Sequence, residues 1–135
     1  MEDKYRKAGE IISEVREEVV KRIDVGIPLL EIAEFVENSI REKGASPAFP
    51  CNISRNDEAA HVTPSAGDES VFGEDMIKID LGAHIDGYIA DTAITVDLSG
   101  NPELVEASES ALSAALEIIK EGVSTAEIGA VIEKT

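Results

Sequence analysis

The sequence is poor in cysteine, aromatic residues and positive charge, and each shortage excludes a class of protein. Cys51 is the only cysteine among 135 residues, so no internal disulfide can form and a reducing, cytoplasmic location is expected. Lysine and arginine total 12 against 28 aspartates and glutamates, which gives a formal net charge of -16. Such a chain repels phosphate backbones, so nucleic acid is not expected as a partner. No apolar run approaches the ~20 residues of a membrane span, and the charged segment MEDKYRKAGE does not resemble a signal peptide.

The N-terminal part of the chain predicts two amphipathic helices followed by a loop. Apolar residues recur at helical spacing over residues 4–24, and again between Pro28 and Lys43. We expect Asp3 to cap the first helix, and a proline in the first turn suits the second. Residues 45–70 hold three of the five prolines, which predicts loop with short extended pieces.

A β-hairpin is predicted farther along. Residues 76–85 and 88–98 alternate in hydrophobicity and flank Asp86-Gly87. That dipeptide is the strongest short hairpin signal, because both turn positions require positive φ. One face of the hairpin is apolar and is expected to join an aliphatic core, since aromatic residues make up only 4% of the chain. The length supports one modest core rather than two independent domains.

The same hairpin carries two aspartates among apolar residues. With a two-residue turn, Asp80 faces Ala93 and Asp91 faces Gly82. Side chains alternate between the faces of a sheet, so both carboxylates are predicted to lie on the face opposite the core. Diagonal neighbours lie about 7–8 Å apart at Cα, within reach of converging side chains. Gly82 is expected to leave open space beside Asp91.

Three interpretations of this carboxylate pair remain open. The aspartates could be ordinary acids on a solvated face, a pair for general acid–base chemistry, or metal ligands. Two converging carboxylates repel, so one stays protonated unless a cation lies between them. Divalent cations prefer such oxygen ligands, and a bridging carboxylate can hold two ions about 3.5–4 Å apart. This favours the metal site, although two carboxylates cannot complete it.

The histidines and the cysteine add one candidate. His61 lies in the polar loop EAAHVTPSAGD, where a histidine is more often functional than in a core. His84 is interpreted as a partly exposed strand residue near the turn. A Cys51–His61 thiol nucleophile has no support beyond the presence of both residues.

A faint internal repeat relates the two ends of the chain. Helices are predicted over about residues 102–121 and from Thr125, a good capping residue. GIPLLEIAEFVE (26–37) and GVSTAEIGAVIE (122–133) share Gly, Glu, Ile and Glu at matching positions, and each follows a helix. We interpret residues 1–135 as a single truncated domain, in which a second copy from about residue 104 is incomplete.

Three segments together resemble methionine aminopeptidase: PAFPCNIS (47–54), NDEAAHVTP (56–64) and KIDLGAHIDGYIADTA (78–93). The AFP…NIS and AAH-x-TP forms are similar to the type 2 branch, in an archaeal-like form. The resemblance implies a pita-bread α/β (α+β) fold, of which this chain is the N-terminal half, with helices packed on a curved antiparallel sheet. The hairpin alone would also fit proline dipeptidases and creatinase-like proteins.

The resemblance implies roles for four residues. Asp80 matches a carboxylate that binds one metal, and Asp91 the carboxylate that bridges two. His61 matches a catalytic histidine that contacts the substrate near the scissile bond, and Phe49 an aromatic wall of the methionine pocket. Two divalent ions are implied as cofactors, drawn from Co, Mn, Fe, Ni and Zn.

The implied activity is removal of the N-terminal methionine from nascent proteins. The complete enzyme is expected to act on peptide N-termini in the cytoplasm, close to the ribosome, as a monomer without membrane attachment. In that family a histidine and two glutamates from the C-terminal half complete the metal site. We therefore expect these 135 residues to be inactive alone and to bind metal weakly. The alternatives are a proline dipeptidase or a non-catalytic binding module of the same fold.

Overall fold

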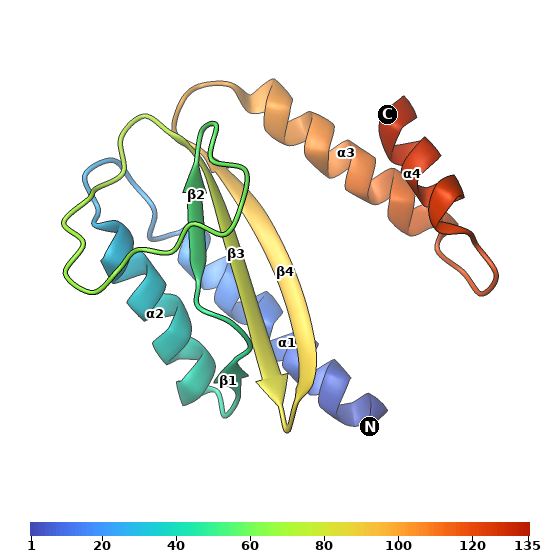
Figure 1. Cartoon of the computed structure of the whole chain (residues 1–135), viewed down its shortest axis with the longest axis horizontal. Helices are drawn as coiled ribbons and strands as arrows, with labels where there is room; N and C mark the ends of the chain where they lie inside the picture. The colour runs from blue at the N-terminus through green and yellow to red at the C-terminus, as the bar shows by residue number, and fades with distance from the viewer. The chain divides into compact units, whose positions relative to one another are not determined.

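A computed structural model describes all 135 residues, which form two compact units, Met1–Gly100 and Asn101–Thr135. The first unit contains two helices and four strands, and the second contains two helices (Figure 1). The elements are α1 (Glu2–Val20), α2 (Leu29–Glu42), β1 (Ser46–Pro47), β2 (Asn52–Arg55), β3 (Met76–Ile85), β4 (Tyr88–Asp97), α3 (Pro102–Ile118) and α4 (Thr125–Lys134). None of the helices has the length and hydrophobicity needed to cross a membrane.

Strand β3 is the central strand of the sheet, because the three other strands all pair with it in antiparallel orientation. β4 pairs along the whole of β3, while β1 and β2 each pair with part of it. Helix α1 packs against β3 and β4, and α2 against β1 and β2. Figure 1 shows α1 passing behind the β3–β4 pair. The expected arrangement of helices on an antiparallel sheet is confirmed.

The core lies between this sheet and the two N-terminal helices, and it is aliphatic apart from Phe72 and Cys51. Alternate residues of β3 are fully buried and meet the apolar stripe of each helix. Each buried Ile, Leu, Val or Phe side chain contributes roughly 1.5–3 kcal/mol through removal from water. The members from β3, α1 and the preceding loop are Ile77, Ile79, Leu81, Ala83, Ile11, Ile12, Val15, Val19 and Phe72.

The β3–β4 turn is formed by Asp86 and Gly87, as predicted. Their φ angles are 51 and 85, the positive values that a two-residue hairpin turn requires. The start of α1 lies against this turn: Lys4 Nζ is 2.6 Å from Asp86 Oδ2, and the rings of Tyr5 and Tyr88 meet edge to face at 5.2 Å. An ion pair and an aromatic contact therefore both hold the hairpin tip against α1.

Two predicted helix caps are wrong. Met1 occupies the N-cap of α1 without a side-chain bond, and Asp3 lies inside the first turn, where its charge complements the helix dipole. Helix α4 is capped by Ser124 rather than Thr125. Ser124 accepts a hydrogen bond from Glu127 N, and the Glu127 carboxylate accepts one from Ser124 N, which forms a capping box.

The second unit buries little apolar surface. Helix α3 has one buried residue, Ala115, and α4 has none. The exposed large apolar side chains of this unit are Leu104, Leu112, Leu116, Ile119 and Ile132. The two helices pack against each other as a helical hairpin. The structure divides the chain at Gly100, and the incomplete second half from about residue 104 stays a prediction.

Candidate metal centre

The hairpin register brings the two aspartates together as predicted. Asp80 pairs with Ala93 and Asp91 with Gly82, so both side chains project from the same face of the β3–β4 pair. Ile79 and Leu81, on either side of Asp80, are fully buried on the opposite face. A slip of one residue would bury the carboxylate and expose the two apolar side chains, so the core fixes this register.

The Asp80 carboxyl group lies close enough to Asp91 to shift the pKa of Asp91. Partial desolvation raises the pKa of Asp91, and the charge of Asp80 and a hydrogen bond to its carboxyl group raise that pKa further. Asp80 is half-buried, whereas Asp91 is exposed. The folded chain without a cation therefore disfavours the charged form of Asp91, which is the direction expected where two acids converge.

This donor set fits part of a divalent metal site. Carboxylate oxygens are the ligands that hard cations prefer, and a cation between Asp80 and Asp91 would offset their repulsion. The chain contains no group of three or more His, Cys, Asp or Glu residues arranged to hold an ion. Asp80 and Asp91 would thus supply two ligands of such a site, and any further ones would come from other residues.

A polar chain links Asp80 to the loop that carries His61. Asn52 faces Asp80 across β2 and β3, and its Nδ2 donates to Asp80 Oδ2 at 3.4 Å. Thr63 Oγ1 donates to Asn52 Oδ1 at 2.7 Å. Nothing in the sequence pattern predicts Asn52, because its pairing with Asp80 depends on how a four-residue strand docks on β3.

Phe49 fills the space that was expected to be open beside Asp91. A Cβ atom at residue 82 would lie 2.9 Å from Phe49 Cζ and nearer still to Cε1. Ala48 N donates to Gly82 O at 2.9 Å, which fixes the backbone just before the ring. The prediction of open space is wrong, because the absent side chain at Gly82 is what admits the phenyl ring. An apolar wall therefore lies against the strand position that faces Asp91.

His61 is an exposed loop residue with a φ of 62. This left-handed conformation is uncommon for a residue with a side chain and is a form of local strain. Ile53 N donates to Val62 O at 2.7 Å, so the residue after His61 is tied to β2. The structure thus brings the residue that follows His61 to β2, the strand on which Asn52 faces Asp80.

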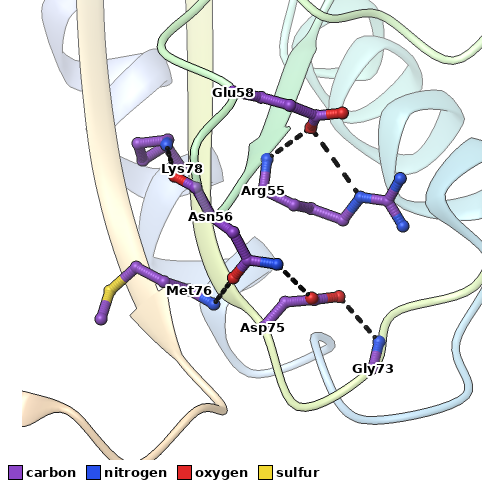
Figure 2. A network of polar contacts seen from close by, with 7 residues as sticks. All are labelled: Arg55, Asn56, Glu58, Gly73, Asp75, Met76 and Lys78. Carbon is purple, nitrogen blue, oxygen red and sulfur yellow. Dashed lines mark hydrogen bonds and ion pairs between the residues drawn. The ribbon is translucent and has the colours of Figure 1, made fainter.

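The start of the His61 loop is anchored by Asn56, as Figure 2 shows. Asn56 Nδ2 donates to Asp75 Oδ1 at 2.7 Å, and Asn56 Oδ1 accepts from Met76 N at 3.0 Å. Lys78 Nζ donates to Asn56 O at 2.8 Å. Gly73 N–H, and then the Asn56 amide, lower the pKa of Asp75. The loop is therefore tied to the sheet on both sides of His61, at Asn56 and at Val62.

His84 and Cys51 have structural roles, one at the hairpin turn and the other in the core. His84 Nδ1 accepts a hydrogen bond from Gly87 N at 3.2 Å and so supports the hairpin turn. Cys51 is 1% exposed, and burial, followed by Glu37 and Asp80, raises the pKa of its thiol to about 12. A protonated, buried thiol is a poor nucleophile, which speaks against the Cys51–His61 interpretation.

The chain belongs to metallopeptidase family M24, whose sequence profile matches residues 3–135. The methionine aminopeptidase of Methanocaldococcus jannaschii is 55% identical over 134 residues, which are 98% of this chain and 46% of that protein. This chain therefore spans less than half the length of that relative.

Two solved structures share the fold over 98% of this chain. The methionine aminopeptidase of Thermotoga maritima superposes with a TM-score of 0.90 at 26% identity, with 57% of its own chain covered. The X-Pro aminopeptidase of Thermotoga maritima superposes with a TM-score of 0.80 at 30% identity, with 39% covered. The expected pita-bread fold is confirmed by these likenesses and by the family match.

Proposed function

We propose that the complete protein removes the N-terminal methionine from peptides and nascent proteins. The observation that carries this proposal is the convergence of Asp80 and Asp91 on one face of the hairpin, with the Phe49 ring packed against Gly82 beside them. The 55% identity to an archaeal methionine aminopeptidase supports the choice of substrate.

Asp80 and Asp91 are proposed as ligands of two divalent ions, with Asp91 shared between them. Bound divalent metal of this kind lowers the pKa of water, so that hydroxide is available near neutral pH. Co, Mn, Fe, Ni and Zn are the candidates, since carboxylate ligands alone do not select among them. Because this chain contributes two ligands, we expect it to bind metal weakly and to be inactive by itself.

His61 and Phe49 are proposed to contact the substrate. His61 would donate a hydrogen bond near the scissile bond as negative charge develops, and one such donor is typically worth about 3–4 kcal/mol. Its loop is tied to β2 by the hydrogen bond from Ile53 N to Val62 O, which holds the backbone next to His61 in place. The Phe49 ring would form an apolar wall that accepts an unbranched methionine side chain.

The proposed setting is the cytoplasm. The buried, protonated thiol of Cys51 suits a reducing compartment, and the acidic surface suits a soluble enzyme that does not bind nucleic acid. Substrates would be N-termini that emerge from the ribosome, and the complete protein is proposed to be a monomer of type 2. Residues 1–135 would be a truncated domain of that protein.

The test is Asp91→Ala in the full-length protein. Loss of methionine release together with loss of bound metal is expected, because Asp91 is proposed as the ligand shared by both ions. Glu17→Ala, an exposed acid on α1, is the matched control and should retain both properties. Methionine release at the wild-type rate with normal metal content in Asp91→Ala would show that the assignment is wrong.

A proline dipeptidase is the second candidate, favoured by the likeness to the X-Pro aminopeptidase structure. Turnover of Xaa-Pro dipeptides without action on Met-initiated peptides would select it. A non-catalytic binding module is the third alternative, and the presence of both Asp80 and Asp91 argues against it.

A further inference from the structure

We propose that Asn52 is a positioning residue that fixes the orientation of the Asp80 carboxylate, and that Thr63 fixes the orientation of Asn52. The proposal concerns the carboxylate's conformation before any ion is present. Its catalytic meaning rests on the proposed function, in which Asp80 is a metal ligand.

The first step is the contact between strands. Asn52 and Asp80 are directly opposed in the β2–β3 register, where facing side chains stand close together on one face. Asn52 Nδ2 lies 3.4 Å from Asp80 Oδ2 and donates to it. Both side chains are half-buried, so water competes less for this contact than at an open surface. The amide thus favours one direction of the carboxylate.

The second step is the orientation of the amide itself. An asparagine side chain has a donor end and an acceptor end, and only the donor end suits a carboxylate. The Thr63 hydroxyl donates to Asn52 Oδ1 at 2.7 Å, which holds the acceptor end away from Asp80. Without Thr63 a flipped amide would place its oxygen against the Asp80 carboxylate, and the two would repel.

The third step is the link to the His61 loop. The 2.7 Å hydrogen bond from Ile53 N to Val62 O holds the loop against β2, which brings Thr63 to Asn52. Thr63 lies two positions after His61, so the loop that carries the histidine also orients the carboxylate of Asp80. Ligands held by such outer contacts are pre-oriented, and loss of the contact typically lowers metal affinity about 10–100-fold.

The first measurement needs neither metal nor activity. Side-chain rotamer populations of Asp80 are obtained by NMR scalar couplings in the 135-residue chain without metal, for wild type, Asn52→Ala and Thr63→Val. Thr95→Val, on β4, is the matched control. One dominant Asp80 rotamer is expected in wild type and in the Thr95→Val control. In Asn52→Ala and Thr63→Val, the couplings should report an average over several Asp80 rotamers. An unchanged single rotamer in Asn52→Ala would overturn the proposal.

The second measurement is a titration with Co²⁺ alone, followed by its visible absorption. We expect Asn52→Ala to weaken binding about 10–100-fold and Thr63→Val to weaken it less. The double variant should be no weaker than Asn52→Ala, because both residues act through one contact. Additive losses of Co²⁺ affinity would show that Asn52 and Thr63 act independently, which would overturn the coupling. A fall in Tm large enough to account for the whole loss of affinity would overturn it as well.

Asp80→Ala separates this proposal from the proposed function. If wild type and Asp80→Ala take up Co²⁺ alike, the assignment of Asp80 as a metal ligand is wrong. The rotamer measurement still decides whether Asn52 orients that carboxylate. Averaged Asp80 rotamers in Asn52→Ala would then show that Asn52 positions a carboxylate that does not bind metal. An unchanged Asp80 rotamer would reject both the positioning role of Asn52 and the metal role of Asp80.

Discussion

The phenyl ring of Phe49 lies directly on Gly82, at the strand position that faces Asp91. Any side chain at residue 82 would occupy the volume of that ring. The Phe49 ring and the Asp91 side chain therefore flank one position of the sheet, and the absence of a side chain at Gly82 is what lets the ring lie there.

Gly82→Ala should displace the Phe49 ring. Because a Cβ atom there would lie 2.9 Å from Cζ, we expect a loss of roughly 1–3 kcal/mol in the free energy of unfolding, measured by urea denaturation. If the proposed function holds, the complete protein with this change should lose selectivity for methionine. Gly9→Ala on α1 is the control, since nothing lies within 4 Å of its Cβ position, and it should stabilise by about 0.5–1 kcal/mol. Equal effects at both glycines would contradict the packing argument.

Asn56→Ala should loosen the His61 loop. The change removes the hydrogen bonds to Asp75 and Met76, each worth about 1 kcal/mol, and strains a residue with a φ of 49. Hydrogen exchange of residues 57–62 should accelerate, while exchange in the core of β3 should not. Asn56→Gly is the matched variant: it loses the same hydrogen bonds but tolerates the backbone, so it should be about 1 kcal/mol more stable than Asn56→Ala.

Asp91→Asn should stabilise the metal-free protein above acidic pH. The pKa of Asp91 is raised in the folded state, so folding disfavours its charged form, and stability is lost as pH rises through that raised pKa. The asparagine variant lacks this loss. Its urea midpoint in EDTA should exceed that of wild type at pH 7, and the two should converge at low pH. Asp57→Asn, an exposed loop acid, should show no such difference.

Cys51 should be inert in the folded chain and should make stability fall at high pH. The pKa of its thiol is raised from 9.0 to about 12, so the stabilising effect is complete below pH 9 and is lost between pH 9 and 12. The slope attributable to this thiol is roughly 1.4 kcal/mol per pH unit. Cys51→Ala should show a shallower fall than wild type, and iodoacetamide at pH 8 should label wild type only after unfolding. Rapid labelling of the folded chain would contradict the burial of Cys51.

The sequence predicts those parts of the site that lie within one hairpin. Alternation of apolar residues and the Asp86-Gly87 turn are local signals, and they place Asp80 and Asp91 on one face without further information. The Asn52–Asp80 and Phe49–Gly82 contacts are not local. They depend on how β2 and the segment after β1 dock on β3, which is decided by packing against α2 and by the length of the connecting loops.

The helix ends, too, are only partly predicted by local sequence patterns. α1 ends at Val20, earlier than its apolar pattern predicts, and Ile23 remains buried after the helix has stopped. A residue can continue an apolar stripe from a turn as well as from a helix, so periodicity alone overestimates the length. The roles of Asp80, Asp91, His61 and Phe49 remain predictions from the resemblance, for which the structure supplies positions.

The central position of β3 has a consequence for the order of folding. Its turn to β4 closes a two-residue loop, whereas its pairing with β2 must close the long connection from Asn56 to Asp75. Short loops close fast and at low entropic cost, so the β3–β4 hairpin is expected to form first. The two acids would then meet early in folding, before Asn52 and the His61 loop reach them, and their repulsion would act while both carboxylates are still exposed to water.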